Sequence, residues 1–225
     1  MLVATLDTQV VATALPTIVA DLGGIRQFAW VSSAYLLAFT ATAPFYGRLG
    51  DLLGQKRVFM FALGLFLAGS AACGVAQSMS QLIAFRAVQG IGAGGLTVSV
   101  FALLGELFDA RQRARYMGYA TAVFAVSSVT GPLVGGLITT HLGWRWVFFY
   151  INLPLGAGAL ALTATLLTVG RGRRRSRVDY CGIAALAGLA VCLVLLSNWA
   201  GTKYAWGSAT IIGLLCGAAA LLAAW

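Results

Sequence analysis

The chain has 225 residues, of which 60% are hydrophobic and only 9% are charged. A soluble domain usually carries about 25% charged residues, so this chain has too few charges to cover a surface that faces water. Its apolar runs are continuous and about 20 residues long, which predicts membrane-spanning helices and excludes a transmembrane barrel of alternating strands. The composition therefore predicts an all-α polytopic membrane protein.

Breaks in the hydropathy predict about eight spans, each long enough to cross a bilayer. In chain order they cover approximately 1–22, 28–47, 58–77, 81–105, 115–140, 146–169, 180–200 and 208–225. The first run has no basic segment before it and contains Asp7 and Pro16, so it is predicted to be a retained span rather than a signal peptide.

The net charge of +9 comes mainly from alternate loops. The loops after spans 1, 5 and 7 carry 3 Lys and Arg residues, namely Arg26, Arg145 and Lys203. The loops after spans 2, 4 and 6 carry 11, namely Arg48, Lys56, Arg57, Arg111, Arg113, Arg115, Arg171, Arg173, Arg174, Arg175 and Arg177. Basic loops stay on the cytoplasmic side, which predicts that both ends of the chain are cytoplasmic. No soluble domain accompanies the run at 171–177, so we expect it to contact anionic lipid headgroups and not nucleic acid.

A weak internal repeat relates two parts of the chain. The pattern G-x6-G-x-[KR]-x-V-F occurs at 47–59 and again at 136–148, a shift of 89 residues. This shift equals three spans, so the second copy would lie on the opposite side of the membrane. Repeats of three plus three spans with inverted topology are typical of transporter bundles.

Two charged residues fall inside predicted spans, Asp7 in the first and Arg86 in the fourth. Charge inside a membrane is costly and usually lines a cavity or a proton relay. The simpler alternatives are a frayed helix end for Asp7 and a side chain that reaches the surface for Arg86. Arg86 shares a small, polar helix face with Gln89, Gly90, Ala93, Gly94 and Thr97, which favours packing against another helix. Counted from the predicted span ends, the depths of Asp7 and Arg86 differ by about 10 Å, so a direct contact does not follow.

Glycine marks two further segments. The stretch 47–57 after the second span contains three glycines that permit a tight turn, and Asp51 could accept from a helix N-terminus or pair with a nearby base. In the fifth span, Gly131 and Gly135 form a close-packing G-x-x-x-G face. Pro132 between them removes a backbone hydrogen bond, which predicts a bend that acts as a seal or hinge.

The remaining reactive residues point away from metal binding and catalysis. The four cysteines lie in or at the start of apolar runs with no C-x-x-C pair, which predicts packing residues and neither disulfides nor a metal site. The single histidine, His141, has no partner base in the sequence. An intramembrane hydrolase is therefore disfavoured.

Together these segments resemble the major facilitator superfamily, and within it the drug:proton antiporters with fourteen spans. The stretch GRLGDLLGQKR resembles the loop signature of the superfamily through Gly47, Leu49, Asp51, Gly54 and Lys56, although Leu52 and Gln55 replace the usual arginines. LIAFRAVQGIGAGG resembles the signature of span 4 through Arg86, Gln89, Gly90 and Gly92. TGPLVGG resembles the antiporter signature through Gly131, Pro132, Gly135 and Gly136, with Ser127 at the place of an upstream glycine. LDTQVVATALPTI and WRWVFFYINLP resemble the family's first span and the entry to its sixth.

The resemblance implies an architecture and a function. It implies a six-span amino-terminal bundle at 1–169, then a basic loop and two extra spans at 170–225, with the carboxy-terminal bundle missing. The chain would be half of an exporter of lipophilic, often cationic compounds across the plasma membrane, with protons as coupling ion and no other cofactor. Asp7 would be titrated beside Arg86, and the stretch after span 2 would form a gate through Gly47, Leu49, Asp51, Gly54, Lys56 and Arg57.

The expected partners are the substrate, the lipid bilayer, and the missing bundle or a second copy of the chain. Two other functions stay open. One is an uptake symporter of the same superfamily, against which the antiporter signature argues. The other is a membrane protein without transport activity that binds partners through its G-x-x-x-G faces.

Overall fold

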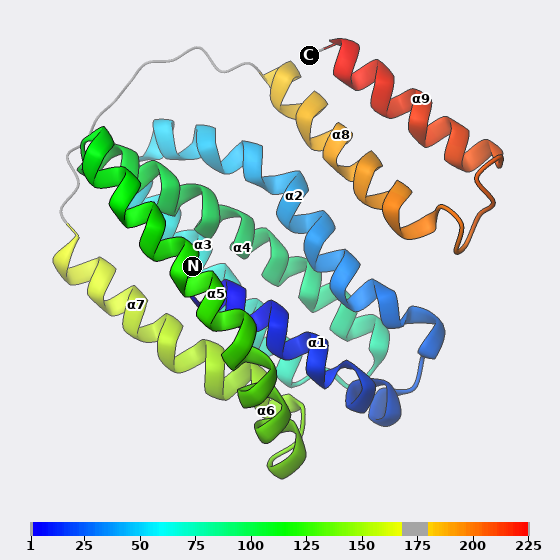
Figure 1. Ribbon diagram of the computed structural model, residues 1–225, viewed down its shortest axis with the longest axis horizontal. Helices are drawn as coiled ribbons and strands as arrows, with labels where there is room; N and C mark the ends of the chain where they lie inside the picture. Colours follow the sequence, from blue (N-terminus) through cyan, green and yellow to red (C-terminus); the bar gives the residue numbers. More distant parts are fainter. Residues whose placement is uncertain (1, 168–179, 225) are drawn as a thin grey trace.

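The computed structural model describes residues 2–167 and 180–224, and nearly all of them are helical (Figure 1). The basic run at 171–177 lies outside these ranges. The six-span part contains α1 (Leu2–Leu22), η1 (Ile25–Gln27), α2 (Phe28–Leu53), α3 (Gln55–Gly74), α4 (Met79–Leu107), α5 (Ala110–His141), α6 (Arg145–Val147), η2 (Phe148–Asn152) and α7 (Leu153–Leu166). The last three elements form one continuous sixth span. Two further helices follow, α8 (Tyr180–Trp199) and α9 (Ala209–Ala224).

Within the described ranges, seven helices are long and apolar enough to cross a membrane, which agrees with the predicted all-α membrane fold. They correspond to the first seven predicted spans, and α9 is a shorter apolar helix of 16 residues. Side chains cap the amino-terminal ends of several helices, including α4 and α5. Ser78 accepts a hydrogen bond from the Gln81 N–H before α4, and Asp109 accepts one from the Gln112 N–H before α5.

The expectation of a glycine-rich loop over 47–57 is wrong. Helix α2 continues through Gly47 and Gly50 to Leu53, and α3 begins at Gln55. Only Gly54 makes the turn, with a φ of +92° that side-chain-bearing residues rarely adopt. Hydropathy marks where apolar residues stop and not where helical hydrogen bonding stops, so it predicts a loop where α2 continues as a polar helix.

Helices pack in parallel pairs through close backbone contacts. Gly131 and Gly135 of α5 face Gln9 and Val10 of α1. Gly90 and Gly94 of α4 likewise face the backbone of α2, at Tyr35 and Phe39. Along both interfaces the residue numbers rise together, so α1 runs parallel to α5 and α2 runs parallel to α4. The small helix faces predicted for spans 4 and 5 are therefore the packing faces.

Gly92 allows the closest packing of α4 against α3. A Cβ built at Gly92 would lie 2.5 Å from the backbone nitrogen of Phe66. We expect Gly92→Ala to destabilise the fold by about 1–3 kcal/mol, because the facing backbone has to move. Thermal unfolding of the detergent-purified protein checks this. Gly64→Ala on α3 is the matched control, since its Cβ would meet nothing within 4 Å. Equal melting temperatures in the two variants would contradict the prediction.

The structure supports the weak sequence repeat. Gly54 and Gly143 occupy equivalent positions in the two copies, and each has a φ of +92°. Gly54 directly precedes α3, and Gly143 lies two residues before α6. Two residues later in each copy comes a basic side chain. Lys56 Nζ donates to the Ala164 carbonyl at 2.9 Å, and Arg145 Nη2 donates to the Ala76 carbonyl at 3.3 Å.

These two hydrogen bonds show that α3 and the sixth span run antiparallel. The base at the start of α3 satisfies a carbonyl in the last turn of α7, and the base at the start of the sixth span satisfies one just beyond α3. Free carbonyls at a helix end favour such cations. The third and sixth spans therefore hold each other at both ends, as expected for the last helices of two inverted three-span repeats.

The two additional helices form an antiparallel hairpin beside α2 (Figure 1), because Gly188 of α8 faces Leu221 of α9 and Cys192 of α8 faces Gly217 of α9. The Ser33 hydroxyl of α2 donates to Asn198 Oδ1 of α8. Trp30 and Trp199 contact edge to face, with 6.0 Å between ring centroids. The hairpin thus lies outside the six-span bundle and does not contribute to its buried polar centre.

Candidate functional site

The two intramembrane charges form an ion pair in the interior of the bundle. Asp7 comes from α1 and Arg86 from α4, and Arg86 Nη1 lies 2.5 Å from Asp7 Oδ2. The two side chains are 0% and 1% exposed. This excludes a frayed helix end for Asp7 and an interfacial position for Arg86. Neither side chain faces open solvent in this conformation.

The contact joins two groups whose depths, counted along the sequence, differ by about 10 Å. Counting residues from the predicted span ends includes neither the tilt of the helices nor the reach of the Arg86 side chain. The structure places both groups at one depth, so they form a single site rather than two separate ones.

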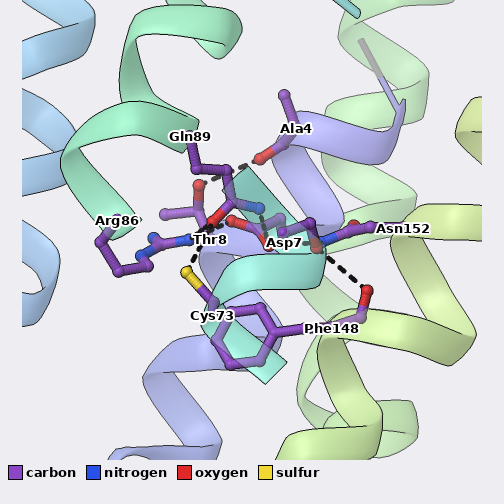
Figure 2. A network of polar contacts seen from close by, with 9 residues as sticks. Ala4, Asp7, Thr8, Cys73, Arg86, Gln89, Phe148 and Asn152 are labelled. Carbon is purple, nitrogen blue, oxygen red and sulfur yellow. Dashed lines mark hydrogen bonds and ion pairs between the residues drawn. The ribbon is translucent and has the colours of Figure 1, made fainter. Parts of the chain in front are cut away.

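Two amides complete the coordination of the carboxylate (Figure 2). Gln89, one turn beyond Arg86 on α4, donates from Nε2 to Asp7 Oδ1 at 2.9 Å and accepts from Arg86 Nη1 at 2.7 Å. Asn152, from the sixth span, donates to the same Asp7 Oδ1 at 2.6 Å. The carboxylate of Asp7 therefore accepts three N–H bonds, one from a cation and two from neutral amides.

Further contacts hold the donors in place. The guanidinium of Arg86 stacks on the ring of Tyr35 from α2, with its Cζ 4.2 Å from the ring centroid. The Cys73 thiol of α3 contacts Gln89 Oε1 at 3.8 Å (Figure 2). Ser70, also on α3, accepts from Asn152 Nδ2 at 2.8 Å. The cluster thus joins spans 1, 2, 3, 4 and 6.

The sequence did not identify Ser70 or Asn152 as site residues. Ser70 is a small residue in an apolar helix and has no distinguishing pattern. Asn152 did carry a signal, because an amide is uncommon in the middle of an apolar span. It lies in WRWVFFYINLP, whose resemblance to the entry of the family's sixth span predicts a span but no site residue.

The arrangement permits proton chemistry at the carboxylate. A buried ion pair costs desolvation energy, and removal of either partner leaves an uncompensated charge. Protonation of Asp7 would cancel one of the two charges and weaken the hold of the carboxylate on Arg86. In the described part of the chain, no group of three or more His, Cys, Asp or Glu residues could hold a metal ion.

The stretch 47–57 is not part of this cluster. Asp51 lies 16 residues beyond Tyr35 on the same helix, which places it about 24 Å away. Arg48 Nη1 lies 3.9 Å from Asp51 Oδ2, so Asp51 pairs with a nearby base, one of the two predicted possibilities. The side chains of Leu49 and Arg57 are exposed.

The residues of the fifth-span signature divide between two environments. Gly131 and Gly135 are buried against α1, where Ser127 Oγ also accepts from Thr5 Oγ1 at 3.2 Å. Pro132 is exposed, and α5 is assigned as one helix through it. A Cβ at Gly136 would meet nothing within 4 Å.

Comparison with known proteins identifies similar chains. The family model of the Major Facilitator Superfamily matches residues 1–225. The chain is 44% identical over 214 residues to the "Multidrug resistance protein 3" of Bacillus subtilis, which covers 95% of this chain and 42% of that protein. It is 42% identical to the "Multidrug transporter protein MdtP" of the same organism, covering 95% of this chain and 39% of that protein.

More distant proteins share the same region. The "Efflux pump FUS6" of Gibberella fujikuroi is 36% identical, over 98% of this chain and 41% of that protein. The chain therefore spans less than half the length of these relatives. The crystal structure of the human organic anion transporter MFSD10 superposes with a TM-score of 0.69 at 18% identity, covering 94% of this chain and 56% of that one. This last likeness concerns the fold alone.

Proposed function

The chain belongs to the Major Facilitator Superfamily, and from that premise we propose that it is the amino-terminal half of a transporter that exports drugs in exchange for protons. Transporters are not enzymes, so the hydrolase alternative no longer applies. The multi-pass architecture and three relatives named as multidrug or efflux proteins support drug export. Proton coupling rests on one observation, the enclosed pair of Asp7 and Arg86.

The proposed mechanism alternates the charge state of Asp7. A proton that enters from outside binds the carboxylate, and the neutral acid then no longer holds Arg86 by charge. The bundle rearranges against the other half of the transporter, and the proton leaves to the cytoplasm. Arg86 then pairs again with the carboxylate, and drug export accompanies this cycle in the opposite direction.

The carboxy-terminal half would cover the open side of this bundle. The outward side of α5 carries a row of exposed apolar residues, Val129, Leu133 and Leu137, at one-turn spacing. Gly136 on the same helix also faces open space. We assign this face to the missing bundle, with the fifth-span signature at the junction as a seal or hinge.

The substrate is proposed to be lipophilic and often cationic. The protein is proposed to reside in the plasma membrane. The basic residues after α2 and α4 lie at one end of the bundle, because these helices are parallel. The positive-inside rule places this end, and both ends of the chain, in the cytoplasm. There the loops would contact anionic lipid headgroups.

Transport in reconstituted vesicles tests the proposed function. The full-length protein is placed in vesicles with a fluorescent lipophilic cation outside, and a pH gradient of either sign is imposed. Antiport predicts that the dye accumulates only when the lumen is acidic. A symporter would accumulate the dye only under the opposite gradient, and a protein without transport activity would match empty vesicles, so either result would overturn the proposal.

A further inference from the structure

The sixth span contains a widened helical turn directly before Pro154. Residues Phe148–Asn152 form a π-helical segment between the helical stretches α6 and α7. Pro154 has no N–H, so the carbonyl of Tyr150 loses the partner that an α-helix would provide. Widened turns of this kind are frequent at functional sites. Asn152 is the last residue of this segment and is 1% exposed.

Hydrogen bonds fix both ends of the widened turn to α3. Asn152 Nδ2 donates to Ser70 Oγ at 2.8 Å, and Ser70 Oγ donates to the Phe148 carbonyl at 3.0 Å. The Ser70 side chain thus contacts the backbone of the first residue of the turn, Phe148, and the side chain of the last, Asn152. This leaves the amide of Asn152 with a fixed direction toward Asp7.

The contact with Asp7 depends on the charge of the carboxylate. Oδ1 accepts from both Gln89 and Asn152, and Oδ2 accepts from Arg86. An amide N–H₂ group can only donate, so a proton added to Oδ1 would face two donors with no acceptor. One of the two amides therefore has to move away, or turn its carbonyl oxygen toward the new O–H, before Asp7 is protonated there. Each donor that is removed should therefore ease protonation.

The other groups around Asp7 are few. Among the residues that the structure describes, the titratable or charged side chains that interact with it are Arg86 on α4, Tyr35 on α2 and Cys73 on α3. Helix α5 presents Ser127, Gly131 and Gly135 to α1, none of which titrates. In this part of the site the sixth span contributes the neutral Asn152.

We propose that Asn152 is a positioning residue for Asp7, held by the widened turn of the sixth span, and that it sets the pH at which Asp7 takes up its proton. The inference rests on the proposed function, because it gives Asp7 a proton to exchange. Asn152 belongs to the second three-span repeat, and the carboxylate of Asp7 that it contacts belongs to the first. Protonation of Asp7 is thereby linked to the geometry of the sixth span.

Infrared titration of the purified full-length protein tests this proposal. The carboxylic acid C=O band of Asp7 is assigned by its loss in Asp7→Asn, and its intensity is followed against pH. Asn152→Leu removes the donor at similar volume, and we expect the titration midpoint to rise by about 1 pH unit. Asn198→Leu on α8 is the matched control and should leave the midpoint unchanged, because Asn198 contacts Ser33 and Val194 outside the cluster.

Should Asn152→Leu fail to fold, Asn152→Ala makes the same test without added bulk. An unchanged midpoint in the folded Asn152 variant, or an equal shift in Asn198→Leu, would overturn the proposal. A different result would contradict the proposed function, namely that Asp7→Asn still transports drug under a pH gradient. The two failures are therefore distinguishable.

Discussion

Asp7→Asn in the full-length transporter is expected to reduce drug efflux driven by a pH gradient by more than about tenfold, a change of about 1.4 kcal/mol or more in the free energy of the coupled step. The amide keeps the shape of the side chain but cannot exchange a proton. Efflux of a fluorescent lipophilic cation from vesicles under an imposed gradient measures the loss. Efflux at the wild-type rate would remove Asp7 from the coupling mechanism.

Two controls separate coupling from folding in this variant. Exchange of labelled for unlabelled drug without any gradient needs no net proton movement, so it should persist in Asp7→Asn. Asp21→Asn alters a carboxylate at the other end of α1, where Asp21 pairs with Arg145 at 2.8 Å and both side chains are partly exposed. This control should keep its efflux driven by the pH gradient.

Arg86→Lys is expected to impair the transporter although it conserves the charge. The guanidinium stacks on Tyr35 and donates from one nitrogen to both Asp7 and Gln89. An ammonium group is compact and strongly hydrated, and it cannot stack in this way. We expect a loss of about 1 kcal/mol in stability, because the planar stacking on Tyr35 is lost although the positive charge stays, and a fall in efflux of about tenfold or more.

Thermal unfolding and the vesicle assay measure these two effects. Arg48→Lys is the matched control, because Arg48 is only partly buried and lies 3.9 Å from Asp51 near the end of α2. It should unfold and transport like the wild type. Wild-type stability together with wild-type turnover in Arg86→Lys would show that only a positive charge is needed at this position.

The sequence allowed the helices to be predicted because a bilayer imposes a length on them. Runs such as 1–22 and 180–200 agree closely with α1 and α8. The small face around Gly90 was also predictable, since close helix packing in membranes needs small residues. The helical continuation of α2 through Gly50 was not predictable, because outside the bilayer neither length nor hydropathy constrains the chain.

The site was predicted only in part. Asp7 and Arg86 stand out in the sequence because charge in a span is costly. Their contact depends on helix tilt and rotation, which packing against neighbouring helices sets and no local pattern encodes. Asn152 reaches Asp7 because of a widened turn and a hydrogen bond to Ser70. Asn152 lies 145 positions from Asp7 and 82 positions from Ser70 in the sequence, so no local pattern predicts these contacts.

The most direct test of the proposed coupling is whether drug movement drives protons through Asp7. Vesicles containing the full-length transporter and a trapped pH-sensitive dye receive a drug gradient with no initial pH gradient. The proposal predicts that the lumen pH changes as protons move against the drug in the wild type, and that it stays constant in Asp7→Asn. Proton movement in Asp7→Asn equal to that of the wild type, or drug flux in the wild type without any pH change, would contradict it.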